Sequence, residues 1–207
     1  MNIKDAVQSI IKPHEDDHLT PLTTIWGETL DVQHPLPEYP RPQMQRDSFI
    51  SLNGYWDYAI TGTMTFPSSY DGKILVPFSP ECQLSGVQRQ LQPEEFLWYR
   101  TTLPEWKDDS AEEQRLLLHF DAVDYLAEVY VNGQFVISHQ GGYLPFSADI
   151  TDFLKEDSNE LLLRVQDQTD SQDQARGKQT LHRGGIFYTA QSGIWQTVWA
   201  EKTPKDY

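Results

Sequence analysis

The stretch Phe120-Asp-Ala-Val-Asp-Tyr-Leu-Ala-Glu-Val-Tyr-Val-Asn-Gly-Gln-Phe-Val-Ile-Ser-His-Gln-Gly-Gly-Tyr143 decides the fold of this chain. Asn132-Gly133 separates two short runs, and Asn-Gly is the preferred pair of a two-residue type I′ turn because both positions need a positive φ. Before the turn, apolar residues at 127, 129 and 131 alternate with Glu128 and Tyr130. Successive side chains of a strand point to opposite faces, so this spacing predicts a β-hairpin that is covered on one face.

Further turn signals recur along the chain at Asp71-Gly72, Gly141-Gly142 and 157–159. Short apolar or alternating runs lie between them, and no helix-length periodic segment alternates with these runs. Evenly spaced short strands are typical of an all-β sandwich or jelly roll. We therefore predict strands at 54–60, 73–76, 97–103, 115–120, 126–131, 135–139, 147–150, 160–166 and 193–201.

The N-terminal region differs from the rest because prolines interrupt it repeatedly. We predict a mostly irregular arm over residues 1–45, with one or two helical turns near its start. From residue 13 the arm should run extended over the domain, with Trp26 and Tyr39 as its anchors. The jelly-roll domain is expected at 46–203, and 204–207 should begin a linker to a second domain.

The composition excludes several classes of function. Sixteen basic against 31 acidic residues give a net charge of −15, which repels the phosphates of nucleic acids. The single cysteine, Cys82, cannot form an internal disulfide, and we interpret it as a small apolar filler. The N-terminus has no signal-peptide pattern and no apolar run is long enough to span a membrane, so we expect a cytoplasmic protein without membrane contact.

Two short motifs need a decision. His14-Glu15-Asp16-Asp17-His18 matches the zinc-binding pattern H-E-x-x-H, but Pro13 precedes it and no apolar face would bury such a helix. We interpret it as a charged surface turn, with a zinc hydrolase as the alternative. Asn159-Glu160 resembles the pair that carries the acid/base carboxylate of several retaining glycosidases. A turn followed by a strand explains it fully, and we predict a structural role.

Two long segments, 79–96 and 168–192, have no clear pattern. Long loops in a compact domain are usually functional or mobile, and both segments carry many charged side chains. Solvated loop charge remains the alternative for each of these residues. The candidates for a polar functional surface include Arg89, Glu94, Glu95 and Arg183.

Five stretches together resemble the N-terminal sugar-binding domain of glycoside hydrolase family 2, the family of β-galactosidase, β-glucuronidase and β-mannosidase. They occur in the family's order and span about residues 39–200. The hairpin with its His-Gln-Gly-Gly-Tyr is the most specific of them and is most similar to β-glucuronidase-like members. The stretches are 39–43 with 51–57, 74–80, 97–104, 120–149 and 192–199.

The resemblance implies a jelly-roll β-sandwich of the galactose-binding-domain-like type. In the family, an immunoglobulin-like domain and then a (β/α)₈ barrel follow this domain, and two glutamates on barrel strands catalyse a retaining hydrolysis. The resemblance thus implies no catalytic residue in this chain, which alone should be inactive. Its partners would be a terminal β-linked sugar and the two missing domains. No cofactor is expected, and a homo-oligomer stays open.

One position departs from the family pattern. In the galactosidase and glucuronidase branches an aspartate six residues before the glycine of the last motif contacts sugar, and here that position is Phe187. The contact would then pass to Tyr188, Gln191 or Arg183, or to stacking on Phe187. The sodium-linked sugar site of some members loses the same carboxylate, so we predict no metal. A stand-alone lectin-like carbohydrate-binding module is the alternative function.

Overall fold

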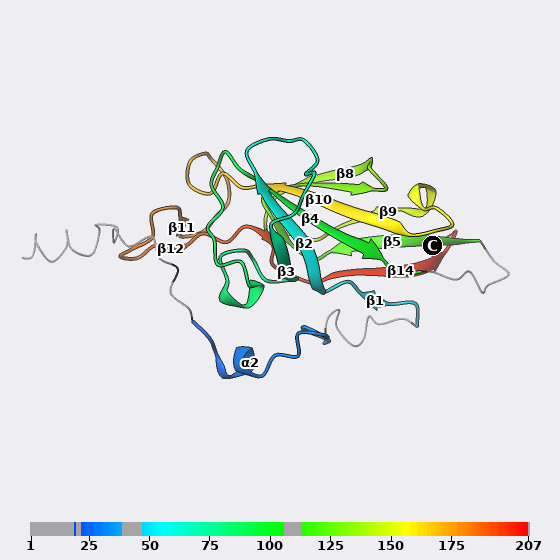
Figure 1. The fold of residues 1–207 in the computed structure, drawn as a ribbon, viewed down its shortest axis with the longest axis horizontal. Helices are drawn as coiled ribbons and strands as arrows, with labels where there is room; N and C mark the ends of the chain where they lie inside the picture. Colours follow the sequence, from blue (N-terminus) through cyan, green and yellow to red (C-terminus); the bar gives the residue numbers. More distant parts are fainter. Residues whose placement is uncertain (1–18, 20–21, 39–46, 106–112, 207) are drawn as a thin grey trace, which may run out of the picture.

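The computed structural model describes residue 19 and residues 22–38, 47–105 and 113–206. Two antiparallel sheets face each other and enclose the core (Figure 1). The architecture is a β-sandwich, as the spacing of short strands predicts, and it fits the galactose-binding-domain-like type that the family resemblance implies.

The larger sheet has six strands in the order β3-β2-β4-β10-β7-β8, and every neighbouring pair is antiparallel. The smaller sheet has the order β1-β14-β5-β9. The strands of the larger sheet are β2 (Gly54–Thr61), β3 (Gly72–Val76), β4 (Phe96–Leu103), β7 (Leu126–Val131), β8 (Gln134–Gln140) and β10 (Asn159–Gln166). Those of the smaller sheet are β1 (Ile50–Ser51), β5 (Gln114–Phe120), β9 (Phe146–Asp149) and β14 (Val198–Pro204).

Short elements complete the described fold. One two-stranded ladder pairs β6 (Val123–Asp124) with β13 (Gly193–Ile194), and a parallel one pairs β11 (Gln179–Thr180) with β12 (Tyr188–Thr189). The helical pieces are α2 (Ile25–Glu28) and two 3₁₀ turns, η2 (Gln83–Ser85) and η3 (Thr151–Phe153). None of the described helices is long and apolar enough to cross a membrane.

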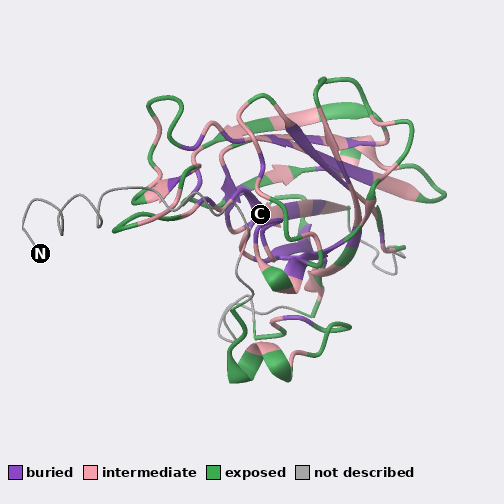
Figure 2. Ribbon diagram, turned by 60° about the vertical axis from the view of Figure 1, so that its left-hand side comes forward, coloured by how far each residue is buried: buried purple, intermediate pink, exposed green. Residues whose placement is uncertain are grey.

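The core lies between the two sheets, where buried residues concentrate (Figure 2). The core forms because every second residue of a strand faces the opposite sheet. In β7 the buried residues are at 127, 129 and 131, and in β5 they are at 116, 118 and 120. Strand β4 is buried on both faces, because Leu97 and Tyr99 enter the core while Trp98 packs on the outer side. There Phe66 covers Trp98 with ring centroids 5.4 Å apart.

The hairpin prediction is confirmed. Asn132 has φ 53° and Gly133 has φ 78°, as a type I′ turn requires. The Asn132 side chain also donates to the Phe153 carbonyl at 2.8 Å and accepts from the Glu160 backbone N–H at 3.0 Å. The turn residue therefore joins the hairpin to the neighbouring strand β10.

One predicted strand is wrong. Residues 193–201 form two strands, β13 and β14, which pair with different partners. Between them the Trp195 backbone N–H donates to the Ala122 carbonyl at 3.3 Å, and the Thr197 carbonyl accepts from Asp121 at 3.0 Å. The chain changes partner here from β6 to β5, and an apolar run does not reveal such a step.

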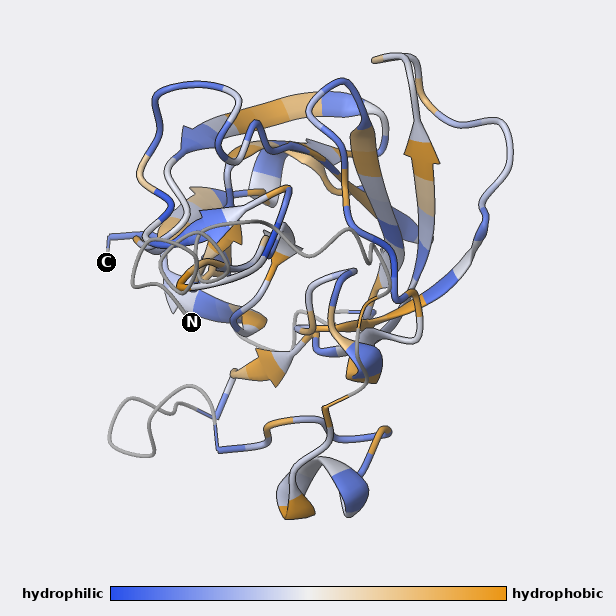
Figure 3. Cartoon of the chain, turned by 90° about the vertical axis from the view of Figure 1, so that its left-hand side faces the viewer, coloured by the Kyte–Doolittle hydropathy of each residue, from blue (hydrophilic) through white to orange (hydrophobic). Residues whose placement is uncertain are grey.

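The described part of the arm runs below the sandwich and contains the helix α2, with both apolar and polar residues on it (Figure 3). Trp26 is wrong as an anchor, because its side chain is 76 % exposed. Contacts come instead from Pro35, which is buried and whose carbonyl accepts from Asn53 Nδ2 at 3.2 Å, and from Thr23, whose hydroxyl donates to Gln83 Oε1 at 2.8 Å. Tyr39 and the predicted helical turns near the start lie outside the described residues. The domain limits 1–45, 46–203 and 204–207 stay predictions.

Candidate functional site

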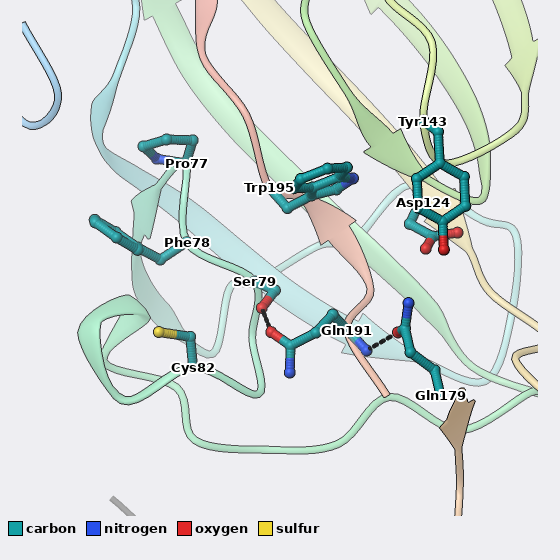
Figure 4. A pocket seen from close by; sticks show the side chains of 9 residues that line it. All are labelled: Pro77, Phe78, Ser79, Cys82, Asp124, Tyr143, Gln179, Gln191 and Trp195. Atoms are coloured by element: carbon teal, nitrogen blue, oxygen red, sulfur yellow. Dashed lines mark hydrogen bonds between the residues drawn. The ribbon is translucent and has the colours of Figure 1, made fainter. Parts of the chain in front are cut away.

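A pocket of about 340 Å³ opens at one end of the sandwich, next to the β6–β13 ladder. Four parts of the chain meet there: the segment after β3, strand β6, the loop after β8 and the stretch that contains β11 and β13 (Figure 4). Most of the lining is carbon. The lining residues are Pro77, Phe78, Ser79, Cys82, Asp124, Tyr143, Gln179, Gln191 and Trp195.

Asp124 is the charged residue of this pocket. It ends β6, and only 3 % of its surface is exposed. Its carboxylate forms no hydrogen bond with any described residue, and Oδ1 is fully enclosed. Burial raises the pKa of Asp124 to about 7, and the nearby Asp167 carboxylate acts in the same direction. Burial of an ionisable group without a partner is costly, so this residue calls for a specific explanation.

Gly142 explains why the carboxylate can lie where it does. A Cβ atom at this position would lie 2.5 Å from Asp124 Cγ, so only glycine allows the loop backbone to pack on the carboxyl group. The Gly142 carbonyl accepts from the Trp195 indole N–H at 2.7 Å. The second glycine of His-Gln-Gly-Gly-Tyr thus brings the β8–β9 loop, Asp124 and Trp195 together.

Ser79, Gln191 and Gln179 are joined by hydrogen bonds. The Ser79 hydroxyl donates to Gln191 Oε1, the Gln191 backbone N–H donates to Gln179 Oε1 at 2.6 Å, and Gln191 Nε2 donates to the Ala190 carbonyl at 2.9 Å (Figure 4). Tyr143 and Trp195 meet edge to face, with centroids 6.2 Å apart. The pocket therefore presents aromatic walls and a carboxylate whose hydrogen-bonding capacity is unused.

Two buried carboxyl groups hold the long loops together behind the pocket. Glu81 Oε1 accepts from the Leu91 backbone N–H at 3.1 Å, and Oε2 accepts from the Ser192 N–H at 3.0 Å. Burial raises the pKa of Glu81 to about 8. Asp167 accepts from the Ser192 hydroxyl at 2.7 Å and from the Thr169 N–H at 2.7 Å. The segments 79–96 and 168–192 are thus tied into the fold and carry η2, β11 and β12, which their sequence did not indicate.

Of the predicted site residues, Gln191 alone lines the pocket. Arg89 and Glu95 form an ion pair in the loop before β4, and Glu94 beside them is exposed. Arg183 is half-buried in the loop before β12.

Phe187 and Tyr188 are 44 % and 66 % exposed. The predicted residues therefore lie on two loops rather than in one cavity. The loops do meet, because Gln90 Nε2 donates to the Leu181 carbonyl at 2.9 Å.

The sequence reasoning missed Asp124, Tyr143 and Trp195 as pocket residues, and a signal for them existed. Six of the nine lining residues fall within the stretches that carry the family resemblance: Pro77, Phe78, Ser79, Asp124, Tyr143 and Trp195. Those stretches indicate the fold, but sequence alone does not show that their side chains line one pocket.

The two short motifs have different outcomes. His14 and His18 lie outside the described residues, and within the described part of the chain no group of three His, Cys, Asp or Glu side chains could hold a metal ion. The structural role of Asn159 is confirmed: its Oδ1 accepts from the Lys155 N–H at 2.7 Å, and its Nδ2 donates to the Asp157 carbonyl at 3.0 Å.

Residues 73–197 match the family model described as "Glycosyl hydrolase 2 galactose-binding domain-like". The chain belongs to this family. The match includes both sides of the pocket, from the segment after β3 to Trp195. It also confirms the resemblance that the hairpin and its flanking motifs indicate.

Among curated relatives of this glycosyl hydrolase 2 domain, a "Beta-galactosidase" of Thermoanaerobacter pseudethanolicus is 36% identical over 102 residues, which are 49% of this chain and 13% of the relative. A "Putative beta-glucuronidase" of Formosa agariphila is 35% identical over 111 residues, which are 53% of this chain and 12% of the relative. The matched residues thus cover about an eighth of the length of each of these two relatives.

Solved structures show the same fold. A Bifidobacterium dentium β-glucuronidase, complexed with coumarin-3-O-glucuronide, has a TM-score of 0.61 at 24% identity over 81% of this chain and 32% of that one. A Faecalibacterium prausnitzii β-glucuronidase has a TM-score of 0.58 at 24% identity over 81% and 33%.

Proposed function

We propose that this chain is the non-catalytic N-terminal domain of a retaining family 2 β-glycosidase. The family match over residues 73–197 carries the proposal, because the relatives that share this domain are named as β-galactosidases and β-glucuronidases. The whole enzyme would hydrolyse a terminal β-linked sugar by double displacement. One glutamate of a barrel would act as the nucleophile and another as the acid/base, with the glycosyl group held on the enzyme between the two steps.

The surface around the pocket supports packing against another domain. Large apolar side chains are exposed on the loop after β8 and on the loop that leads into β12. The two loops are neighbours, because Tyr143 of the first and Gln179 of β11, which pairs with β12, line one pocket. Exposed apolar groups that gather in one place mark interaction sites. They are Tyr143, Leu144, Ile186, Phe187 and Tyr188.

The substrate contacts of this domain would come from the same end. We propose that the loops 83–95 and 176–192 form part of the rim of the substrate pocket of the whole enzyme. Arg183 and Tyr188 would reach a sugar hydroxyl, Gln191 would do so by exchanging its hydrogen bond to the Ala190 carbonyl, and Phe187 offers an aromatic face. Arg89, Glu94 and Glu95 lie on the adjoining loop, where the polar groups would contact the more distant part of a substrate.

The test compares this chain with the longer protein. Purified residues 1–207 should not hydrolyse 4-nitrophenyl β-galactoside, β-glucuronide or β-mannoside. The reading frame beyond the codon of Tyr207 should encode a sandwich domain and a barrel with two glutamates, and the longer protein should hydrolyse one of these substrates. Turnover by residues 1–207 alone, or a frame that encodes no barrel, would exclude the proposal.

The lectin-like alternative gains no support from the pocket. A saccharide presents several hydroxyl groups, and a site for it needs several free polar partners. Here Ser79, Gln191 and the side-chain oxygen Oε1 of Gln179 are already joined by hydrogen bonds. A cytoplasmic location and a homo-oligomer stay predictions from the sequence.

A further inference from the structure

The buried carboxylate of Asp124 has no hydrogen-bond donor among the described residues. The residue is 3 % exposed, lines the pocket and forms no hydrogen bond with any residue that the structure describes. A buried polar group without a partner costs free energy, and native proteins satisfy nearly all such groups. The pocket therefore lacks a group that donates a hydrogen bond to Asp124 or carries a positive charge.

The composition of the pocket narrows the choice of this group. Ser79, Gln191 and the side-chain oxygen Oε1 of Gln179 are joined by hydrogen bonds. The Trp195 indole N–H donates to the Gly142 carbonyl. A ligand would thus meet the Asp124 carboxylate, the Tyr143 hydroxyl and the Gln179 amide nitrogen among walls that are mostly carbon. A polyhydroxylated ligand has more hydroxyl groups than these three groups can pair, whereas a single cationic group on a short apolar stem needs only the carboxylate.

The electrostatics also favour a cation. The charged neighbour that acts on Asp124 is Asp167, another carboxylate, so the two reinforce a negative potential inside the pocket. The chain as a whole carries a net charge of −15. Trp195 and Tyr143 stand edge to face at 6.2 Å, which leaves other parts of the ring faces open to the pocket. Aromatic faces attract guanidinium and ammonium groups, and more strongly where water is excluded.

We propose that the pocket between Trp195, Tyr143 and Asp124 binds an alkylguanidinium or alkylammonium group, which pairs with the Asp124 carboxylate. The proposal concerns this chain alone and does not depend on the glycosidase assignment. The same chemistry has two sources, an arginine or lysine side chain of an adjoining polypeptide and a small free cation, and the experiment below separates them.

The test uses n-propylguanidinium and its uncharged counterpart of the same shape, n-propylurea. Backbone amide and indole N–H resonances of the ¹⁵N-labelled chain are followed by NMR at pH 8 and constant ionic strength. The guanidinium should cause saturable shifts at Gly142 and at the Trp195 indole, with a dissociation constant on the order of 1 mM for so small a ligand. Propylurea should cause none.

Two variants and a pH series test whether the ligand binds in this pocket. Asp124→Asn should weaken binding at least about tenfold, because it removes the charge and keeps the shape. Tyr143→Ala, at a side chain that is 47 % exposed, should weaken it severalfold without loss of the fold. If Asp124→Asn does not fold, the wild-type chain gives the same answer: binding should weaken at least about tenfold from pH 8 to pH 5 as the carboxylate is protonated.

The source is tested with the blocked tripeptide Gly-Arg-Gly and its citrulline counterpart. Binding of the arginine peptide at the same resonances, without binding of the citrulline peptide, assigns the pocket to a basic side chain. Binding of propylguanidinium without the peptide assigns it to a small free cation. The proposal is overturned if propylurea binds equally well, if Asp124→Asn or low pH leaves binding unchanged, or if methyl β-glycosides saturate the same resonances more tightly.

Discussion

Gly193, in the last of the family motifs, provides a test of how closely the two sides of the sandwich fit. Its φ is 75°, and a Cβ atom there would lie 2.1 Å from the Tyr99 hydroxyl oxygen. The same hydroxyl accepts from the Ile194 backbone N–H at 3.1 Å. Gly193→Ala should lower the free energy of unfolding by about 2–5 kcal/mol, from left-handed backbone strain of about 1–2 and overpacking of about 1–3.

The new Cβ atom at position 193 would clash mainly with the Tyr99 hydroxyl, so removal of this hydroxyl should restore part of the stability. Tyr99→Phe alone leaves the buried Ile194 N–H without an acceptor, at a cost of about 1–3 kcal/mol. In the double variant the nearest atoms to the new Cβ would be Leu97 Cδ2 at 3.0 Å and the ring carbon Cζ at 3.1 Å, which small shifts can accommodate. The double variant should therefore cost at least about 1 kcal/mol less than the two single variants together.

Urea denaturation at 25 °C, followed by tryptophan fluorescence, measures this coupling. Gly72→Ala is the matched control: a Cβ there would make an ordinary 3.4 Å contact with Tyr58, and its φ is not positive, so stability should change by less than about 0.5 kcal/mol. Single-variant effects that add to within about 0.5 kcal/mol would show that Gly193 is needed only for its backbone conformation, and the steric argument would be wrong.

Two further changes should affect stability in defined ways. From about pH 4.5 to 8 the free energy of unfolding should fall by up to about 5 kcal/mol, because folded Glu81, whose pKa is about 8 against an ordinary 4.5, retains a proton that the unfolded chain releases. Denaturation at pH 5, 6.5 and 8 should show this slope. Asp124, whose pKa is raised to about 7, adds a slope of the same sign, so Glu81→Gln should reduce the slope without abolishing it; an unchanged slope would assign the effect to other groups. Asn132→Gly keeps the turn conformation but removes the bonds to Phe153 and Glu160, and should cost about 2–3 kcal/mol. Asn132→Ala should cost about 1 kcal/mol more because it adds the strain of a positive φ, and equal costs for the two variants would contradict that role for the turn.

Most of the fold could be predicted from local sequence patterns. Alternation and turn chemistry are properties of neighbouring residues, so the hairpin around Asn132 could be predicted from sequence, as could the strands of both sheets except β1 and the start of β14. The failures share a different cause. β6 and β13 are two residues long and exist because Asp124 and Gly193 pair across a long sequence separation. Such ladders leave no periodic signal.

The candidate site was less predictable, because its parts come from distant segments. Arg89, Glu94 and Glu95 were chosen as charged residues on a long loop, and charge on a loop does not indicate where a side chain points. Asp124 lies within a strand-like run, where a carboxylate was not expected to be buried. Its enclosure is seen only in the folded chain, where Gly142 packs against its carboxyl group and 3 % of the residue is exposed.

The order of strands in the smaller sheet has a consequence for the synthesis of the protein. β14 lies between β1 and β5, and the Ser48 hydroxyl donates to the Lys202 carbonyl across 154 residues. β5 thus leaves the ribosome about 80 residues before the neighbour that completes its sheet. At about 5–20 residues per second one backbone edge of β5 waits roughly 4–16 s for that partner. Throughout this interval the nascent chain carries an unpaired strand edge, which makes it prone to aggregate, so translation speed across this region should influence yield.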